Sequence, residues 1–175
     1  HCQFSWILNM TASNDIVVVQ DTFYSLRRGN DGRVALYSAK LNEEFKQISS
    51  RGDIPIYGDG FACTPMDNNR FAYVGGIGEG IISTEVHIYD IETNTWMEIH
   101  PKLGLLKRRS EHKVVSDGNT LYLFGGKGQL SLIPDWITIH IEGDTFTATI
   151  AHATDHWPMP RIGHTMIKAD KVVAL

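Results

Sequence analysis

The chain has very few cysteines, and this scarcity excludes two classes of small protein. Only Cys2 and Cys63 occur among its 175 residues. Two cysteines cannot form a disulfide framework or a cysteine-based metal cluster. We therefore expect both to be free thiols in a reducing compartment.

Long apolar runs are also missing. No stretch of about 18 apolar residues occurs, so no membrane-spanning helix is expected. Residues 1–11 lack the basic start and apolar stretch of a signal peptide. The chain begins with His1 and looks cut from a longer one. Together these features predict an intracellular, cytoplasmic protein that does not act on membranes.

The sequence has no excess of basic charge. Its formal net charge is -4 and its pI is about 6.0. Residues 107–109 are the one short basic run, and a solvated loop explains that run more simply than a nucleic-acid surface, which needs clustered basic charge. No nucleic-acid partner is expected.

A metal site is not expected either. His152 and His156 have a spacing that metal sites use, but no glutamate follows His152, so the zincin motif is absent. The segment is predicted to be a loop without a third ligand. The sequence thus predicts no bound metal, no cofactor and no catalytic residue.

Two segments follow one design, and they organise the chain. Each has an apolar strand that ends in two glycines, then a loop, a second strand, a turn and a large aromatic residue. The glycine pairs begin at Gly75 and Gly125, which are 50 residues apart, as are the aromatic residues Trp96 and Phe146. Self-similarity at a fixed period of this size indicates a repeat architecture.

The repeat divides the chain into units of four short strands. We place the units at 1–50, which is divergent, at 59–100, at 109–151 and, in part, at 161–175. Polar residues at 67–69 and at 117–119 predict a tight hairpin within the second and third units.

The first unit is the least regular. Gln20 and Asp21 stand near the place of the glycine pair. The spacing of Leu41, Phe45 and Ile48 also fits one face of a helix, but the repeat register favours a strand. The expected strands are 3–11, 16–19, 34–39 and 45–48, with a loop around residues 29–32.

The glycine pairs, the spacing of Tyr89 and Trp96, and the sequence Arg161-Ile162-Gly163-His164 together resemble the kelch repeat, whose period is near 50. The resemblance covers 59–151 well and 161–175 as a partial unit. It implies an all-β fold, a fragment of a kelch-type β-propeller with about three and a half four-stranded blades. Propellers close with about 4–8 blades, so this chain would expose blade faces and edges and is expected to self-associate.

Other motifs give weaker signals. Residues 75–80 are rich in glycine, but they lack the G-x-G-x-x-G spacing and do not lead into a helix, which argues against a phosphate loop. Residues 51–53 read Arg-Gly-Asp, a tripeptide that occurs often by chance. His112 and His164 occupy the same repeat position, which favours a structural role over catalysis.

The resemblance implies a protein-interaction scaffold, because similar kelch propellers bind protein or peptide partners through loops at one face. In peptide-binding relatives, arginines at the start of a blade line the central opening, and the matching positions here are Arg109 and Arg161, with Ser110 beside the first. Arginine suits an acidic partner. An equal alternative is that each arginine only holds its own loop. Asp59, taken as the matching residue of the second unit, argues against a uniformly basic opening.

Two other readings stay open. Kelch-like propellers include enzymes that act on sugars, namely copper-dependent oxidases and epimerases, although no suitable Tyr, His and Cys set can be placed here. The chain also fits a structural segment of a large assembly. Among the interaction modules that the resemblance implies, some are substrate receptors of ubiquitin ligases and others bind actin, and no BTB or F-box segment is present here to choose between them.

Overall fold

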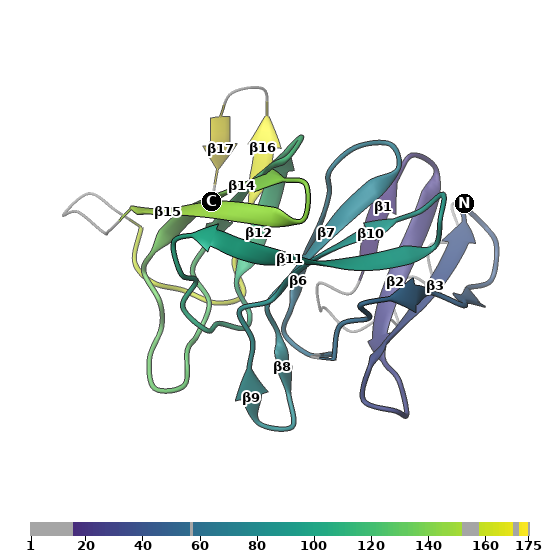
Figure 1. Cartoon of the computed structure of the whole chain (residues 1–175), viewed down its shortest axis with the longest axis horizontal. Coiled ribbons are helices and arrows are strands. Elements are labelled where there is room, and N and C mark those ends of the chain that lie inside the picture. The colour runs from purple at the N-terminus through teal and green to yellow at the C-terminus, as the bar shows by residue number, and fades with distance from the viewer. Residues whose placement is uncertain (1–15, 57, 152–157, 170–171, 175) are drawn as a thin grey trace, which may run out of the picture.

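The computed structural model describes residues 16–56, 58–151, 158–169 and 172–174. Strands and turns fill these ranges, and no helix occurs in them, so the all-β prediction is confirmed. In the same part of the chain there is accordingly no helix long and apolar enough to cross a bilayer. Figure 1 shows successive sheets lying beside one another along the chain.

The first blade is an antiparallel sheet whose strands are neighbours in chain order. It consists of β1 (Ile16–Val19), β2 (Thr22–Arg28), β3 (Val34–Lys40) and β4 (Lys46–Ile48). The helical alternative for residues 41–48 is therefore excluded. The strand expected over 3–11 lies outside the described residues.

The second and third blades repeat this order. Blade 2 consists of β6 (Ala62–Pro65), β7 (Arg70–Val74), β10 (Val86–Asp90) and β11 (Thr95–Leu103), with a small hairpin of β8 (Ile77–Gly78) and β9 (Ile81–Ile82) between β7 and β10. Blade 3 consists of β12 (Lys113–Asp117), β13 (Thr120–Phe124), β14 (Trp136–Glu142) and β15 (Thr145–Ala151). Both predicted tight turns connect the first two strands of their blades.

A fourth unit begins with one hairpin, formed by β16 (Ile167–Ala169) and β17 (Val172–Ala174). The strand β16 lies beside β12, the first strand of blade 3. The first strands of consecutive units thus lie next to one another, as they do around the axis of a propeller.

The structure corrects the expected register of blade 1. Sequence patterns left Thr22–Arg28 unassigned, yet β2 is the second strand of the blade and pairs with both β1 and β3. Gln20 and Asp21 form the turn before β2, where blades 2 and 3 have their tight hairpins. Gly29 and Asn30 follow β2, so they stand in the place of the glycine pair. This pair was overlooked because Asn30 stands where the other blades have their second glycine.

The segments that cross into blades 2 and 3 each add a strand to the blade that they enter. The short β5 (Arg51–Gly52) pairs in parallel with β11 at Thr95 and Trp96. In the same way the end of β11, from His100 to Leu103, pairs in parallel with β15. This pairing covers the outer edge of each receiving blade, an edge that would otherwise be open to association.

Two glycines permit this crossing. Gly52 and Gly104 have φ angles of 84° and 80°, in the left-handed region that glycine adopts without strain. A Cβ on Gly52 would overlap the carbonyl oxygen of Trp96, and one on Gly104 would overlap that of Ala148. Only a residue without a side chain fits this close to the outer strand.

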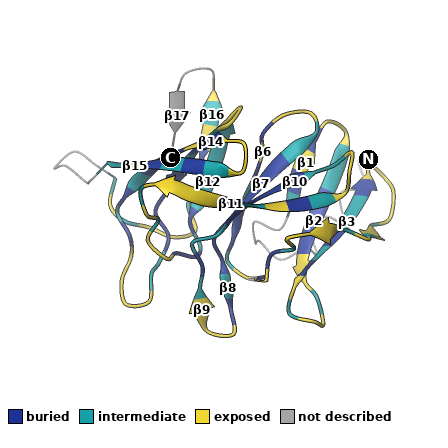
Figure 2. Cartoon of the chain, viewed as in Figure 1, coloured by how far each residue is buried: buried dark blue, intermediate teal, exposed yellow. Residues whose placement is uncertain are grey.

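The core lies between the blades, and the strands of blade 2 contribute to both of its halves (Figure 2). On β7, Phe71 and Tyr73 join side chains of blade 1 in one buried cluster, whereas Ala72 and Val74 join side chains of blade 3 in the other. Alternation along a strand sends successive side chains to opposite faces. A strand buried on both faces therefore reads as a continuous apolar run.

The aromatic residues that recur at the repeat period pack between the blades. Trp96 lies in the cluster between blades 1 and 2, and Phe146 lies in the cluster between blades 2 and 3. The ring of Trp96 meets those of Phe71 and Tyr73 edge-on, with centroid distances of 5.7 and 6.0 Å. Burial of one such side chain stabilises the fold by about 1.5–3 kcal/mol.

Candidate functional site

The loops between the second and third strands of three blades project to the same side, the lower side in Figure 1. The start of each following blade lies on that side too, because a bridge pairs Asp59 with Ile77 and another pairs Ser110 with Lys127. We call this surface the loop face. It comprises the loops 29–33, 77–82 and 127–134 and the blade starts 58–61, 109–112 and 161–164.

A histidine and a glycine pack together at two blade boundaries of the loop face. A Cβ on Gly75 would lie 2.8 Å from Cε1 of His112 and 2.9 Å from the carbonyl oxygen of Arg109. A Cβ on Gly125 would lie 2.8 Å from Cε1 of His164. The two histidines thus have the same environment, which is that of a packing residue.

Burial keeps these histidines neutral. It lowers the pKa of His112 to about 3, and the charge of Arg109 lowers it further, whereas the Val74 carbonyl opposes the shift. Burial also lowers the pKa of His164. A histidine that stays neutral through the physiological range does not exchange protons readily, so neither ring is suited to general acid–base work at neutral pH.

Arg109 lies inside the loop face, with only 2% of its surface exposed. Its guanidinium donates to the carbonyl oxygen of Gly125 at 3.1 Å and lies 3.8 Å from a carboxylate oxygen of buried Asp135. Burial lowers the pKa of Arg109 to about 10, and Asp135 raises it. The side chain therefore remains charged at neutral pH and links the start of blade 3 to the following loop.

Ser110 and Arg161 have contrasting environments. Ser110 is buried, and its backbone exchanges hydrogen bonds of 3.0 and 2.8 Å with Lys127. Arg161 is exposed, and its Nε donates to the carbonyl oxygen of Met159 at 3.0 Å. Of the three sequence-predicted site residues, Arg161 alone presents its side chain to solvent.

The register of blade 2 also needs correction. The two bridges make Asp59, rather than Gly58, the counterpart of Ser110. Gly58 is then the counterpart of Arg109, so blade 2 has no side chain at that position. The expected match between Asp59 and the arginines was wrong by one residue.

Asp135 and the glycines Gly52 and Gly104 were not recognised in the sequence. Asp135 follows Glu85 by 50 residues, and Gly104 follows Gly52 by 52. The repeat could have revealed all of them, because a polar residue or a glycine that recurs at the repeat period marks a shared position.

The remaining motifs have structural roles where the structure describes them. Residues 77–82 form the β8–β9 hairpin, with Glu79 and Gly80 at positive φ as a two-residue type I′ turn requires. Arg51 and Gly52 pair with β11, and the Asp53 carboxylate accepts from the backbone N–H of Glu98. His152 and His156 lie outside the described residues.

Metal ligands and thiols were the remaining candidates for chemistry in the sequence. Within the described ranges, no three His, Cys, Asp or Glu side chains stand close enough to hold a metal ion. Cys63 forms no disulfide within those ranges, and Cys2 lies outside them.

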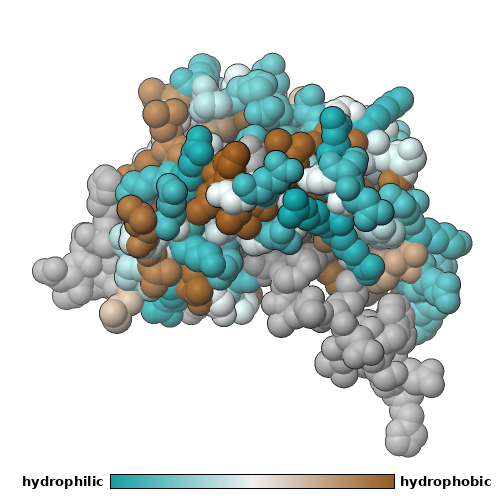
Figure 3. All heavy atoms as spheres, turned by 90° about the horizontal axis from the view of Figure 1, so that it is seen from below, coloured by the Kyte–Doolittle hydropathy of each residue, from teal (hydrophilic) through white to brown (hydrophobic). Residues whose placement is uncertain are grey.

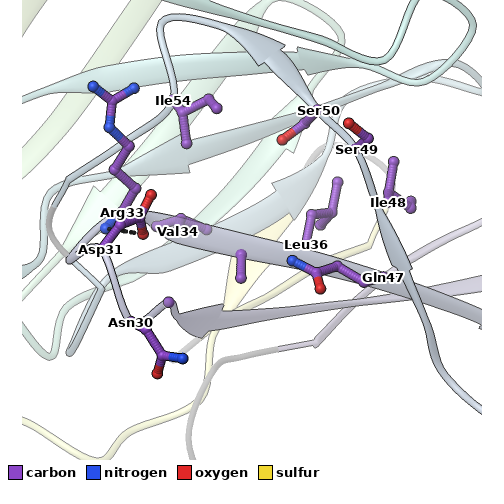
Figure 4. Close-up of a pocket in the computed structure, with 12 residues that line it drawn as sticks. Asn30, Asp31, Arg33, Val34, Leu36, Gln47, Ile48, Ser49, Ser50 and Ile54 are labelled. Atoms are coloured by element: carbon purple, nitrogen blue, oxygen red, sulfur yellow. Dashed lines mark hydrogen bonds between the residues drawn. The ribbon is translucent and has the colours of Figure 1, made fainter.

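Two cavities open in the described structure. One of about 400 Å³ lies beside β3, where the short β4 ends and leaves Val34 and Ala35 without an outer strand (Figure 4). The other, about 630 Å³, lies between the first strands of the four units, and Asp67, Asp117 and Lys168 line it. The second cavity marks the place of a propeller axis, at the end away from the loop face.

Comparison with known proteins agrees with this architecture. Residues 27–175 match the family described as the KLHDC2/KLHL20/DRC7 Kelch-repeats domain. The chain is 28% identical over 118 residues to Kelch domain-containing protein 10 of Homo sapiens, a match that covers 65% of this chain and 26% of the relative. It is 32% identical over 104 residues to the protein of the same name from Xenopus tropicalis, which covers 56% and 24%.

The chain thus spans about a quarter of the length of the curated relatives it matches. These similarities do not support the sugar-enzyme alternative. The family match covers most of the sequence, including blades 2 and 3 and the start of the fourth unit. The chain therefore belongs to the family of Kelch-repeat domains, and its described residues form part of a β-propeller.

Proposed function

We propose that this chain is part of a protein-interaction module that binds a protein or peptide partner through the loop face. The supporting observation is that most blade faces and edges are used in packing, whereas the loops of the loop face are not. The inner faces of the blades are buried against one another, and crossing segments cover the outer edges of blades 2 and 3. The loops of the loop face are left to carry recognition, as loops on a rigid scaffold commonly do.

The backbone of the loop face is held in place before any partner arrives. Ile77 and Lys127 exchange backbone hydrogen bonds with the blade starts at Asp59 and Ser110. The tip of the 77–82 loop is a paired hairpin. A preorganised surface loses little conformational entropy on binding, so more of the contact energy contributes to affinity.

The three predicted site residues have different parts in this proposal. Arg161 contacts the partner directly, because its guanidinium is exposed and free to pair with an acidic group. Arg109 and Ser110 hold the surface from beneath through Gly125, Asp135 and Lys127. An acidic partner then follows from the arginine at the surface.

Self-association of the isolated chain is a second, separate proposal. Among the described residues nothing pairs with the outer edge of β17, and Ile167 beside it is exposed. Such an edge favours pairing with another chain. Sedimentation of the isolated chain tests this, and a monomer at every concentration would contradict it.

Site-specific photo-crosslinking tests the proposed function in the intact protein. A photoreactive phenylalanine replaces Glu79 or Gln129 on the loop face, or Glu92 in the turn between β10 and β11 at the other end of blade 2. Protein adducts are expected from the first two positions and not from the third. Adducts from Glu92 alone, or equally from all positions, would place the binding surface elsewhere.

A further inference from the structure

Apolar side chains on the loop face gather around the loop between β13 and β14. Brown patches of apolar surface lie beside hydrophilic residues in the view from below (Figure 3). We call the set around this loop the ledge. Its exposed members on the loop face are Leu130, Leu132, Ile162 and the cation Arg161, and Arg108 and Met159 join them from the segments just before two blade starts.

Among the described residues, Leu130 is the most exposed large apolar side chain, at 97%. It sits in a turn closed by a hydrogen bond of 2.9 Å from the Gly128 N–H to the Ser131 carbonyl, and a bridge between Lys127 and Leu132 closes the base of the loop. Packing of the blade therefore does not use Leu130, although the loop holds it in a defined place. Leu130 belongs to a group of exposed apolar side chains, and such a contiguous patch rimmed by polar residues marks an interaction surface.

The two arginines come from segments on either side of this loop. A Cβ on Gly128 would lie 3.5 Å from the carbonyl oxygen of Arg108. The Arg161 carbonyl accepts a hydrogen bond of 3.0 Å from the Gly126 N–H. Blade 3 and the fourth unit thus bring Arg108 and Arg161 to the same loop that carries Leu130.

The charges of the ledge do not balance. Lys107 pairs with Asp135 at 2.7 Å, and Lys127 pairs with Glu111. Within the described residues, no carboxylate lies at ion-pair distance from Arg108 or Arg161. The ledge therefore combines apolar side chains with two positive charges that no described carboxylate pairs with.

We propose that the ledge binds an acidic amphipathic segment of a protein partner, an inference that rests on the proposed function. Apolar side chains of the segment cover Leu130 and Leu132, and its carboxylates pair with Arg108 and Arg161. Glu79 at the tip of the neighbouring loop repels further acidic charge, so the segment binds over blade 3 and the fourth unit. Two arginines do not make the clustered basic surface on which nucleic-acid binding rests.

Panning of phage-displayed 12-residue random peptides against the intact protein tests this proposal. Enriched sequences are expected to combine Leu, Ile or Phe with Asp or Glu. Synthetic peptides of the enriched sequences should bind at least ten-fold more weakly to Leu130→Asp. Binding should also weaken several-fold in Arg161→Ala and as salt rises from 50 to 500 mM, because exposed charge pairs are screened.

Leu41→Asp is the matched control, because Leu41 is 58% exposed in the turn after β3, away from the loop face. Its affinity for the same peptides should equal that of the unsubstituted protein. No enrichment, enrichment without acidic residues, or equal loss in Leu41→Asp would overturn the proposal. So would a dimer that Leu130→Asp converts to monomer, because a second copy would then be the occupant.

The outcomes also distinguish a failure of the ledge proposal from a failure of the proposed function. If crosslinks form at Glu79 and Gln129 but Leu130→Asp and Arg161→Ala leave partner affinity unchanged, the loop face still binds a partner and only the ledge chemistry is wrong. If no crosslinks form on the loop face, the proposed function itself fails.

Discussion

Gly75 of blade 2 and His112 of blade 3 meet across the boundary between their blades, so closely that a Cβ on the glycine would lie 2.8 Å from the imidazole. Gly125 and His164 repeat this relationship at the next boundary. The glycine pair that marks the repeat in the sequence is thus an inter-blade contact as well as a strand ending.

Substitution of Gly75 should weaken the fold more than substitution of a glycine with equal backbone strain and open space around it. Gly75→Ala adds a methyl group against His112 at a φ of 64°, whereas Gly118→Ala, at 56°, meets nothing within 4 Å. We expect Gly75→Ala to cost about 1–3 kcal/mol more, from overpacking. Equal urea midpoints for the two variants would contradict this, because they would show that the contact between the blades accommodates the methyl group without loss of stability.

His112 should make stability depend on pH. The unfolded chain binds a proton near pH 6.5 that folded His112 does not bind until about pH 3, so the stability of the fold falls as pH decreases through that window. The expected slope is about 1.4 kcal/mol per pH unit for each such group. His87, whose pKa burial lowers to about 4, contributes in the same sense.

His112→Phe isolates the contribution of His112, because Phe61 occupies the matching position in blade 2. Urea unfolding at pH 4.5, 5.5 and 7.0 should give a shallower pH dependence for this variant than for the unsubstituted chain. Parallel curves would mean that His112 titrates alike in the folded and unfolded states.

Substitution of Arg109 should lower the stability of the fold much more than substitution of Arg161. Arg109→Ala leaves the buried Gly125 carbonyl without its charged donor and should destabilise by about 1–3 kcal/mol, while Lys107 still pairs with Asp135. Arg161→Ala should change stability by no more than about 0.5 kcal/mol, since its side chain is exposed. Equal effects on the thermal midpoint would contradict the different placements of the two side chains.

Most of the fold could be predicted from the sequence because the residues that mark the repeat also have a packing role that requires their residue type. Gly75, Gly125, Trp96 and Phe146 each recur at 50 residues and each packs between blades. The strand β2 was missed since Ser25 and two arginines interrupt its apolar pattern and Asn30 replaces the second glycine. Gly78, in the glycine-rich segment 75–80, is buried in β8.

The contacts and the exposure of residues in the candidate site could not be predicted from the sequence. The partner of Arg109 is Asp135, 26 residues away, and Gly58 stands at the matching place in blade 2, so no repeated pair revealed the contact. The exposure of Leu130 follows from the length and closure of one loop, which periodicity does not encode. Burial of an individual side chain in a loop depends on neighbours from other blades.

Hydrogen exchange of the intact protein, with and without a partner captured by crosslinking, tests the central claim most directly. If the loop face is the binding surface, the backbone amides of residues 127–132 and 161–164 should become protected on binding, and those of the turns at 91–94 and 143–144 should not change. Protection confined to those turns, or none at 127–132, would contradict the assignment of the loop face as the site of partner binding.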